Sequence, residues 1–349
     1  MRIPASPIRT ILTHRRKRRA RFGLLWRLVA LLVLATGVFF TVELDPIGRV
    51  QLALSQVEDL PTLDEMDRVL VLAPHPDDEV LCTGGLIQSA IAAGAEVQVV
   101  FLTLGDSNMA AFQAYERRPV VTPSQVRAMG EIRRTEALRS LALLGVSADR
   151  VRFLGYPDGG ILRIWESHWQ DSRPLRTAFT RVDRVPYLET LSPGAEYRGE
   201  SVLQDLVDAI SSFAPTVIFV SHPDDSNVDH RGIWLFTHAA LAELGPSFED
   251  VQVWTSLVHY GSWPPSGAEV AGEYLFPPEQ LTGPGVEWYT LILTDEQLQS
   301  KRAALNEHRT QVSFRRSYLK RFVRPNELFA RIRPARLAAP ADGVVSYAS

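Results

Sequence analysis

An alternation of strand-like and helix-like segments constrains the fold of this chain more than any other feature. VLVLA at 69–73 is typical of a buried strand, residues 80–93 of a helix, and EVQVVFLTL at 96–104 of a second strand. This order predicts a parallel sheet with right-handed crossovers. Further helices are expected at 124–144, 201–213 and 231–244, and further strands at 151–154, 216–220, 251–260 and 286–294. We therefore predict an α/β fold, a Rossmann-like three-layer sandwich with a mostly parallel sheet.

The predicted domain spans residues 66–330. Its final helix is expected to begin at Asp295, whose carboxylate would cap the helix N-terminus. Residues 161–200 fit the alternation poorly and are long for a connection. They form either a lid or binding loop, or a surface excursion with a small core of its own. Residues 331–349 are expected to form a loosely ordered tail.

The N-terminal 44 residues differ sharply in charge from the rest. The whole chain has a net charge of −3, but this segment carries nine basic side chains and one acidic one, which leaves −11 for the remainder. The basic segment 1–21 precedes an apolar run at 22–42 that is long enough for one transmembrane helix. Basic residues favour the cytoplasmic side, so the chain beyond the linker at 43–65 is expected outside the cytoplasmic membrane.

Two alternatives exist for this N-terminal segment. A cleaved signal peptide has the same order of basic and apolar regions, but no Ala-x-Ala site follows the apolar run, which favours an uncleaved anchor. The cluster RRKRRARF also resembles a nucleic-acid-binding patch. Placed directly before an apolar run, it is expected to set the membrane topology instead. We therefore expect a membrane partner and no nucleic acid, and we predict no oligomeric state.

Composition excludes several classes of protein. The chain is 46% hydrophobic and 22% charged, which is ordinary for a globular protein and excludes collagen, intrinsic disorder and a multi-pass membrane protein. Cys82 is the only cysteine, so neither an internal disulfide nor a thiolate metal cluster can form. No G-x-G-x-x-G follows the first strand, which argues against a nicotinamide dehydrogenase. Any metal ion must be held by His, Asp or Glu.

Ligands of open parallel sheets bind beyond the carboxyl ends of the strands, and the first such loop is APHPDDEV. It places His75, Asp77, Asp78 and Glu79 between a strand and a helix. Acidic residues at a helix N-terminus often act as caps. Capping does not explain a histidine together with three acids. Imidazole nitrogen and carboxylate oxygen are ligands that zinc accepts, so this loop is a candidate metal site.

Two later loops carry further candidates. SHPDDSNVDHRG at 221–232 repeats the tetrapeptide HPDD and adds Asp229 and His230 at the start of the next helix. Two histidines and one carboxylate would leave a fourth position for water, which is typical of a catalytic zinc. FLGYPDGG at 153–160 contains Asp158. That signal is weaker, because Pro-Asp-Gly is also ordinary turn chemistry.

Together, these motifs resemble the N-acetylglucosaminyl-phosphatidylinositol de-N-acetylase family, the PIG-L/LmbE-like zinc deacetylases, over about residues 66–330. The most specific match is HPDDE, from His75 to Glu79, after a hydrophobic strand. The remaining matches are Arg133 and Glu136 in an R-x-x-E helix, Asp158 in GYPDGG, YRGESVLQDLV at 197–207, Asp229-His230-Arg231, and the segment from Lys301 to Gln311.

The resemblance implies a zinc-dependent deacetylase that removes the acetyl group from an N-acetylglucosamine-type amino sugar and releases acetate. It makes His75, Asp78 and His230 the ligands of one zinc ion and Asp77 the general base. With the domain outside the membrane, the expected substrate is an N-acetylated envelope glycan, a glycolipid or a related glycoside.

The resemblance also assigns residues around the substrate. Arg133 and Asp158 match positions that contact the sugar. Family members commonly carry a histidine where this chain has Asn227, and that histidine is thought to stabilise the oxyanion or protonate the leaving amine. Asparagine can donate a hydrogen bond but cannot supply a proton. We expect Asp77 to perform both the acid and the base step, or one of two other histidines to assist: His259 in catalysis or His222 at the substrate.

The sequence also fits two other functions. Clustered Asp and His also suit a metal-dependent hydrolase of another bond, such as a phosphoester. Asn227 in place of histidine would also fit a catalytically silent, sugar-binding member of the family. The first alternative predicts two metal ions per chain, and the second predicts sugar binding without acetate release.

Overall fold

A computed structural model describes residues 57–117, 120–170, 172–265 and 273–332 of the chain. The predicted basic segment 1–21, the predicted membrane span 22–42, most of the linker and most of the tail lie outside the described residues. Within the described ranges, no helix combines the length and the apolar character needed to cross a membrane.

A mixed sheet of eight strands forms the centre of the described part, in the order β1-β7-β8-β6-β5-β2-β3-β4. Only β8 is antiparallel to its neighbours, and the other pairings are parallel. This confirms the predicted mostly parallel α/β sheet. The strands are β1 (Glu58–Asp59), β2 (Arg68–Ala73), β3 (Glu96–Thr103), β4 (Val151–Tyr156), β5 (Val217–Ser221), β6 (Gln252–Ser256), β7 (Val286–Ile292) and β8 (Asn326–Ile332).

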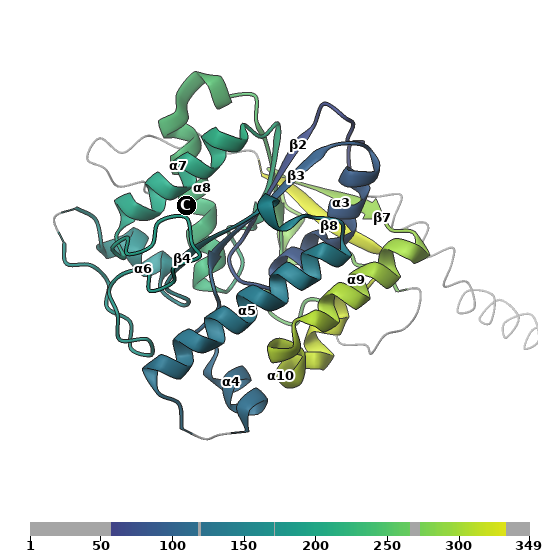
Figure 1. Cartoon of the computed structure of the whole chain (residues 1–349). Helices are drawn as coiled ribbons and strands as arrows, with labels where there is room; N and C mark the ends of the chain where they lie inside the picture. Colours follow the sequence, from purple (N-terminus) through teal and green to yellow (C-terminus); the bar gives the residue numbers. More distant parts are fainter. Residues whose placement is uncertain (1–56, 118–119, 171, 266–272, 333–349) are drawn as a thin grey trace, which may run out of the picture. The chain divides into compact units, whose positions relative to one another are not determined.

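Helices cover both faces of the sheet (Figure 1). On one face α7 packs against α8, and on the other α9 packs against α3 and α5. The helices are α3 (Asp78–Ala92), α4 (Met109–Glu116), α5 (Pro123–Leu143), α6 (Ile161–Ser167), α7 (Gly199–Phe213), α8 (Val228–Leu244), α9 (Asp295–Glu307) and α10 (Arg309–Leu319). The described part is therefore a three-layer arrangement.

The central strands are buried on both sides, which explains their continuous apolar sequences. Val69 and Leu70 of β2 have no exposed surface, and Ile218 of β5 has none either. Full burial of an aliphatic side chain contributes about 1.5–3 kcal/mol. Parallel strands covered by helices on both faces are apolar without alternation, so these strands fix the position of the loops that follow them.

The secondary structure differs from the sequence-based expectations in several places. The strands β1 and β8 and the helices α4, α6 and α10 were not predicted. Helix α9 is capped by Thr294 rather than by Asp295, because the Thr294 hydroxyl accepts the backbone N–H of Gln297 at 3.2 Å. Asp295 is the first residue inside the helix, where its charge still favours the helix dipole.

The segment 161–200 packs onto the main core. After α6 it continues without regular helices or strands until α7, and the buried side chains of Leu175, Val185 and Tyr187 belong to the same apolar cluster as the central strands. These side chains therefore pack on the main core rather than on one another alone, and the interpretation of the segment as a lid or binding loop stays a prediction. Its residues Leu175 to Phe179 also line the cavity described below.

Strand β2 is the switch point of the sheet: the chain adds β3 and β4 on one side of it and then returns to add β5 and β6 on the other. Its neighbours are β3 on one side and β5 on the other. The chain leaves β2 into α3 and leaves β5 into α8, and these helices cover opposite faces. The two loops consequently diverge at the carboxyl edge, where open α/β sheets bind their ligands.

Candidate metal centre and active site

The loop after β2 holds Asp77 in an unusual backbone conformation. Asp77 has φ +132°, which is rare for a residue with a side chain. Its backbone N–H donates to Glu79 Oε2 at 2.8 Å, and Glu79 Oε1 lies 2.9 Å from Nε2 of buried His308. Contacts from α3 and from the start of α10 therefore stabilise a strained turn. Such strain is typical of functional sites.

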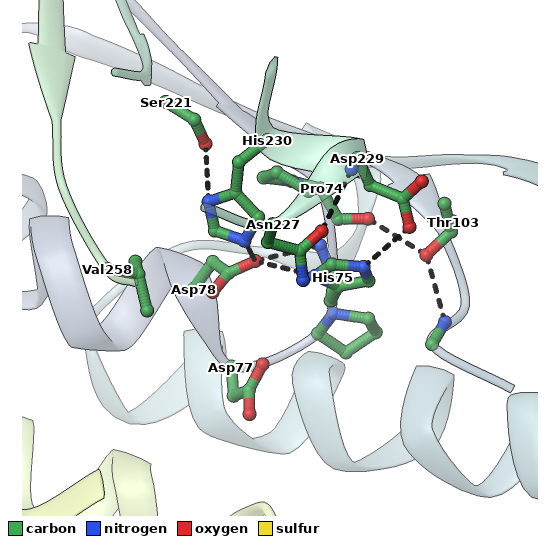
Figure 2. Close-up of polar contacts among 12 residues, drawn as sticks. Pro74, His75, Asp77, Asp78, Thr103, Ser221, Asn227, Asp229, His230 and Val258 are labelled. Atoms are coloured by element: carbon green, nitrogen blue, oxygen red, sulfur yellow. Dashed lines mark hydrogen bonds and ion pairs between the residues drawn. The ribbon is translucent and has the colours of Figure 1, made fainter. Parts of the chain in front are cut away.

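His75 is held by carboxylates on both ring nitrogens. Its Nε2 lies 3.0 Å from Asp229 Oδ2 and 3.3 Å from Asp158 Oδ1, whereas its Nδ1 lies 3.1 Å from Asp78 Oδ2 (Figure 2). Asp229 is itself fixed, because it accepts the backbone N–H groups of Gly159 and Ile161 at 2.6 and 2.9 Å. A carboxylate on the outer nitrogen of a histidine orients that ring as a metal ligand.

In His230, one ring nitrogen is supported by the surrounding protein and the other faces Asp78. Its Nδ1 lies 3.0 Å from Ser221 Oγ and 3.3 Å from Asp225 Oδ2. Its Nε2 is buried and makes no hydrogen bond, although Asp78 Oδ2 is only 3.2 Å away. A supported Nδ1 and an unbonded Nε2 that faces a carboxylate are typical of a metal-binding histidine.

His75, Asp78 and His230 therefore converge on one point, and Figure 2 shows their side chains directed toward one another. One ligand atom from each lies within 4.8 Å of the others. Two imidazoles and a carboxylate form a donor set that suits zinc. The residues present fit a divalent metal ion, and the sequence-predicted ligands are the ones brought together.

The charges of this cluster favour a cation. Burial disfavours protonation of His230, but the charges of Asp225 and Asp78 outweigh burial and raise its pKa to about 10. Burial would raise the pKa of Asp78, yet His230 and His75 hold it well below its usual range. The carboxylates thus stabilise positive charge at the position where a metal ion would be bound.

Asp77 lies beside the three candidate ligands and contacts a buried arginine. Burial raises its pKa to about 6, and the charge of Arg133 acts against this rise. Arg133 Nη2 lies 3.3 Å from Asp77 Oδ1, and the same guanidinium donates to the backbone oxygens of Gly105 and Pro76 at 2.6 and 2.5 Å. A carboxyl group with a pKa near neutrality can both accept and return a proton.

Gly105 is required for the position of this arginine. It has φ +62°, and a Cβ atom placed there would lie 1.9 Å from Arg133 Nη1. Only glycine allows the guanidinium to approach the backbone this closely. Arg133 can therefore occupy this position only because residue 105 has no side chain.

A cavity of about 570 Å³ opens above this cluster. Its floor includes His75, Asp77, Asp78 and Asp158, and Asn227 and His259 also line it. Further parts of the wall come from the loop after β3, from α6, from the segment that follows it and from α10. A volume of this size is in the range of small-molecule binding sites.

Asn227 and His259 both line the cavity, and different contacts hold them there. The side-chain oxygen of Asn227 accepts the backbone N–H of Asp229 at 2.8 Å and so caps α8. His259 Nδ1 lies 3.3 Å from Asp225 Oδ1. Asp225 also accepts the backbone N–H of His259 at 2.8 Å, which fixes the loop that follows β6 beside the cavity.

His222 lies in the protein interior, away from the cavity. It has no exposed surface, it is absent from the cavity wall, and its ring stacks on Trp288 with a centroid distance of 5.7 Å and an interplanar angle of 5°. Its Nδ1 accepts the backbone N–H of Asp224 at 3.1 Å. The structure therefore corrects the expectation that His222 contacts substrate, because packing against β7 turns the ring into the interior.

Asp158 and Arg133, expected at the substrate, both line the cavity. Asp158 Oδ2 accepts the backbone N–H of Ser107 at 2.8 Å. Burial opposes ionisation of Asp158, but the charge of His75 and the hydrogen bonds it receives lower its pKa. It is therefore a charged group on the cavity floor, 3.3 Å from a candidate ligand.

Several residues of the site were not assigned a role from the sequence. Asp225 and Asp229 support the histidines from behind, and Glu79 with His308 supports the strained turn. The repeat of HPDD and the pair Asp229-His230 were the available signals for the first two. Gln311 ends the segment from Lys301 that matches the family pattern. Nothing in the local sequence indicated that the rest of α10 would reach the cavity, where it contributes Arg315, Tyr318 and Leu319.

Two other clusters in the described residues also have metal-ligand distances. They are Asp225, His230 and His259, and His75, Asp158 and Asp229. The oxygens of Asp225 already accept backbone N–H groups from Asn227, Val258 and His259. Asp229 likewise accepts two backbone N–H groups. These carboxylates are therefore better suited to hold the histidines than to bind the ion itself.

Comparisons with known proteins agree on one family. A profile of the PIG-L family, described as GlcNAc-PI de-N-acetylase, matches residues 70–241. The 1D-myo-inositol 2-acetamido-2-deoxy-alpha-D-glucopyranoside deacetylase of Mycobacterium sp. (strain KMS) is 29% identical over 271 residues, covering 73% of this chain and 78% of that protein. The protein of the same name from Mycolicibacterium vanbaalenii is 30% identical over 261 residues, covering 71% of this chain and 82% of that protein.

One solved structure with a similar chain is the N,N'-diacetylchitobiose deacetylase from Pyrococcus horikoshii. The two chains are 21% identical, with a TM-score of 0.46, and the match covers 77% of this chain and 84% of that chain.

Proposed function

The chain belongs to the PIG-L family, and from that premise we propose that it is a zinc-dependent hydrolase that removes the acetyl group from an N-acetylglucosamine-type amino sugar. The products are acetate and the free amine. One observation carries the proposal: His75 Nδ1 and His230 Nε2 lie 3.1 and 3.2 Å from Asp78 Oδ2. His75 and Asp78 line the cavity, and the acidic side chain of Asp77 lies beside them.

His75, Asp78 and His230 would hold the metal ion. A bound zinc ion polarises an amide carbonyl and lowers the pKa of water toward about 7. Asp229 and Asp225 orient the two histidines, because each contacts the nitrogen that faces away from the common point. A donor set of two imidazole nitrogens and one carboxylate oxygen is one that zinc accepts, which supports zinc as the proposed metal.

Asp77 acts as the general base. It lines the cavity, lies next to the candidate ligand Asp78 in sequence, and has a pKa of about 6. A base with a pKa near the working pH accepts the proton of an attacking water and can return it to the departing nitrogen. Arg133 keeps its carboxylate in position through the contact at 3.3 Å.

Asn227 and His259 provide the donors on the opposite part of the cavity. Asn227 uses its oxygen to cap α8, so its NH₂ group is the part that can donate to the developing oxyanion. His259 is held by Asp225 and is the alternative to Asp77 as the group that protonates the departing nitrogen, which asparagine cannot do. Asn227 and His259 together would thus replace the histidine that family members commonly carry at position 227.

Acetate release is the direct test. The full-length chain would be stripped of metal, restored with zinc and incubated with a panel of N-acetylglucosaminides. We expect zinc-dependent acetate release that falls by about 10²–10⁴-fold in Asp77→Asn, because the general base is lost. Binding of one zinc per chain without acetate release from any substrate would overturn the proposal in favour of a sugar-binding role.

We further propose that residues 22–42 anchor the protein in the cytoplasmic membrane with the catalytic domain outside, so that its substrate is an envelope glycan or glycolipid. The apolar length of this segment and the preceding basic residues support this topology. External protease should degrade the domain in intact cells. Protection of the domain from the protease, with degradation only after lysis, would contradict it.

A further inference from the structure

A buried ion pair joins α9 and β8 to the middle of α3. Lys301 Nζ lies 2.6 Å from Glu327 Oε1, and each side chain has only 1% of its surface exposed. Lys301 Nζ also donates to the backbone oxygen of Leu81 at 2.9 Å. The carboxylate of Glu327 accepts the backbone N–H groups of Gly85 and Leu86 at 2.7 and 2.8 Å. Both charges therefore bind the backbone of α3, and we call them the α3 ion pair.

The α3 ion pair contacts both groups that one helical hydrogen bond would join. In a regular α-helix, the N–H of Gly85 donates to the carbonyl of Leu81, four residues earlier. Here Lys301 donates to that carbonyl, and Glu327 accepts that N–H. Hydrogen bonds to a charged group are stronger than those between neutral groups. The pair therefore fixes α3 along its axis, as well as toward α9 and β8.

Two glycines allow α9 to approach the backbone of α3. A Cβ atom at Gly84 would lie 3.0 Å from Cγ of Lys301. A Cβ atom at Gly85 would lie 2.1 Å from Cδ2 of Leu293, two residues before α9. Glycine in a helix interior is unfavourable relative to alanine. The close approach of α9 accounts for two glycines at this point of the helix.

The first turn of α3 belongs to the metal centre. Asp78 is the first residue of the helix, and the strained Asp77 precedes it. Leu81 lies three residues further on, so the ion pair binds the helix about 4.5 Å along its axis from Asp78. Asp78 Oδ2 lies 3.1 Å from His75 Nδ1 and 3.2 Å from His230 Nε2. A shift of α3 along its axis would change both distances, whereas a metal site holds its ligands to within about 0.2 Å.

Stability alone does not account for two charges in the interior. Burial of an ion pair costs solvation free energy, and apolar side chains of similar volume are often as stable or more stable in its place. Lys301 and Glu327 also do not line the cavity described above. Their distinctive contribution is the orientation of α3, because charge-assisted hydrogen bonds to backbone groups are directional.

We propose that the α3 ion pair positions the metal centre: it sets the axial position of α3 and thereby the distance of the Asp78 carboxylate from His75 and His230. Lys301 and Glu327 are thus positioning residues, which act on the metal ion only through Asp78. This inference rests on the metal-dependent function proposed above, and it adds residues from α9 and β8 to the groups on which that function depends.

The test removes both charges at once. The double variant Lys301→Met with Glu327→Leu leaves no unpaired buried charge, and it allows the Gly85 N–H to return to the Leu81 carbonyl. The full-length protein would be stripped of metal, and its zinc affinity would be measured by competition with a chromophoric chelator. We expect the affinity of the double variant to fall by about tenfold or more, as is typical of residues that support metal ligands. Circular dichroism would verify that the variant is folded.

Cobalt in place of zinc reports on the arrangement of the ligands without any substrate. The visible absorption bands of bound Co²⁺ depend on coordination geometry, so they should shift in position or intensity in the double variant. Leu206→Ala is the matched control, because Leu206 is buried on α7, which packs against α8. This substitution lowers stability by leaving a cavity in the core. Its zinc affinity and cobalt spectrum should equal those of the unsubstituted protein.

Unchanged zinc affinity and an unchanged cobalt spectrum in the folded double variant would overturn this inference and leave the metal centre intact. An equal loss of zinc affinity in Leu206→Ala would also overturn it, because the effect would then reflect stability alone. Failure of the unsubstituted protein to bind either metal would instead overturn the proposed function.

A milder variant decides the matter if the double variant does not fold. Glu327→Gln keeps the shape of the side chain and one acceptor oxygen but removes the charge. We expect its zinc affinity to fall by about threefold, as expected for one weakened hydrogen bond, with a shift of the cobalt bands in the same direction. Zinc affinity and cobalt bands identical to those of the unsubstituted protein would refute a positioning role.

Discussion

The tetrapeptide His-Pro-Asp-Asp occurs twice in this chain, at 75–78 after β2 and at 222–225 after β5. In the first copy, His75 and Asp78 face the cavity and the common point with His230. In the second copy, the histidine stacks on Trp288 in the interior, and the last aspartate contacts His230 and His259 from behind. Identical residues at neighbouring strand ends thus serve as candidate ligands in one loop and as supports in the other.

The difference comes from what each strand end is packed against. The first copy leads directly into α3, whose first residue is Asp78, so its carboxylate lies at a helix N-terminus beside the cavity. The second copy is followed by a further turn before α8 begins at Val228, and His230 on that helix occupies the position beside Asp78. A motif therefore indicates a site only together with the element that follows it.

The largest effects are expected in the first copy. His75→Gln and Asp78→Asn each remove a candidate ligand, so bound zinc and acetate release should both fall by more than about 100-fold, beyond the loss typical of residues that only orient ligands. Metal content by atomic emission and acetate release by enzymatic assay would measure this. Zinc retained at one ion per chain in both variants would contradict the assignment.

The second copy should show an intermediate effect at its last aspartate. Asp225→Asn keeps the shape of the side chain but removes the charge that supports His230 and His259. We expect zinc affinity or activity to fall by about 10–100-fold. Zinc affinity and kcat should be measured separately for Asp225→Asn and Asp78→Asn, so that the two copies of the tetrapeptide can be compared in both properties. An effect as large as that of Asp78→Asn would mean that the two copies do not differ in role.

Asp106, a buried carboxyl group in the loop that follows β3, extends the comparison. Burial raises the pKa of Asp106 to about 7, with repulsion from Asp158 in the same direction, while the hydrogen bonds from Tyr187 and Ser107 and the charge of Arg133 act against this. The folded protein therefore keeps the proton that the unfolded chain loses above about pH 4.

The free energy of unfolding should accordingly fall with rising pH between about pH 4 and 7, by up to about 1.4 kcal/mol per pH unit from this group. Asp106→Asn removes the titration, so its stability relative to the unsubstituted protein should increase over that range and level off above pH 7. Urea unfolding at pH 5, 6 and 7 measures the difference. A constant difference across the three pH values would show that Asp106 is ionised throughout.

The smallest effect is expected at the histidine of the second copy. His222→Gln loses the stacking on Trp288 but can still accept a hydrogen bond, so we expect a loss of about 1 kcal/mol in stability. Acetate release per folded molecule should change by less than about threefold. A large rise in KM with unchanged stability would restore His222 as a substrate contact and remove the contrast between the copies.

The strands and loops that carry the site could be predicted from the sequence, because the local pattern of apolar residues determines the strands. The apolar run at 69–73 and the one at 216–220 correspond to β2 and β5, and parallel strand ends share one sheet edge, so His75 and His230 were expected to meet. The antiparallel strand β8 was missed because its sequence carries two acidic or basic residues and follows a proline, although contacts with β6 and β7 stabilise it.

The supporting residues could not be predicted, because they act through contacts between distant parts of the chain. Glu79 contacts His308 across 229 residues, and Asp225 contacts His259 across 34. The interior position of His222 depends on Trp288, which belongs to a strand on the other side of the sheet centre. Strand and helix patterns carry no information about such partners, so the same tetrapeptide was interpreted alike in both places.

The position of the metal ion tests the account most directly. Crystals of the full-length protein grown with zinc would be measured at the zinc absorption edge, where an anomalous-difference peak locates the ion. We predict one peak, at about 2.0–2.2 Å from His75 Nδ1, Asp78 Oδ2 and His230 Nε2. A peak among Asp225, His230 and His259 would place the ion in the second HPDD copy and contradict the division between ligand and support.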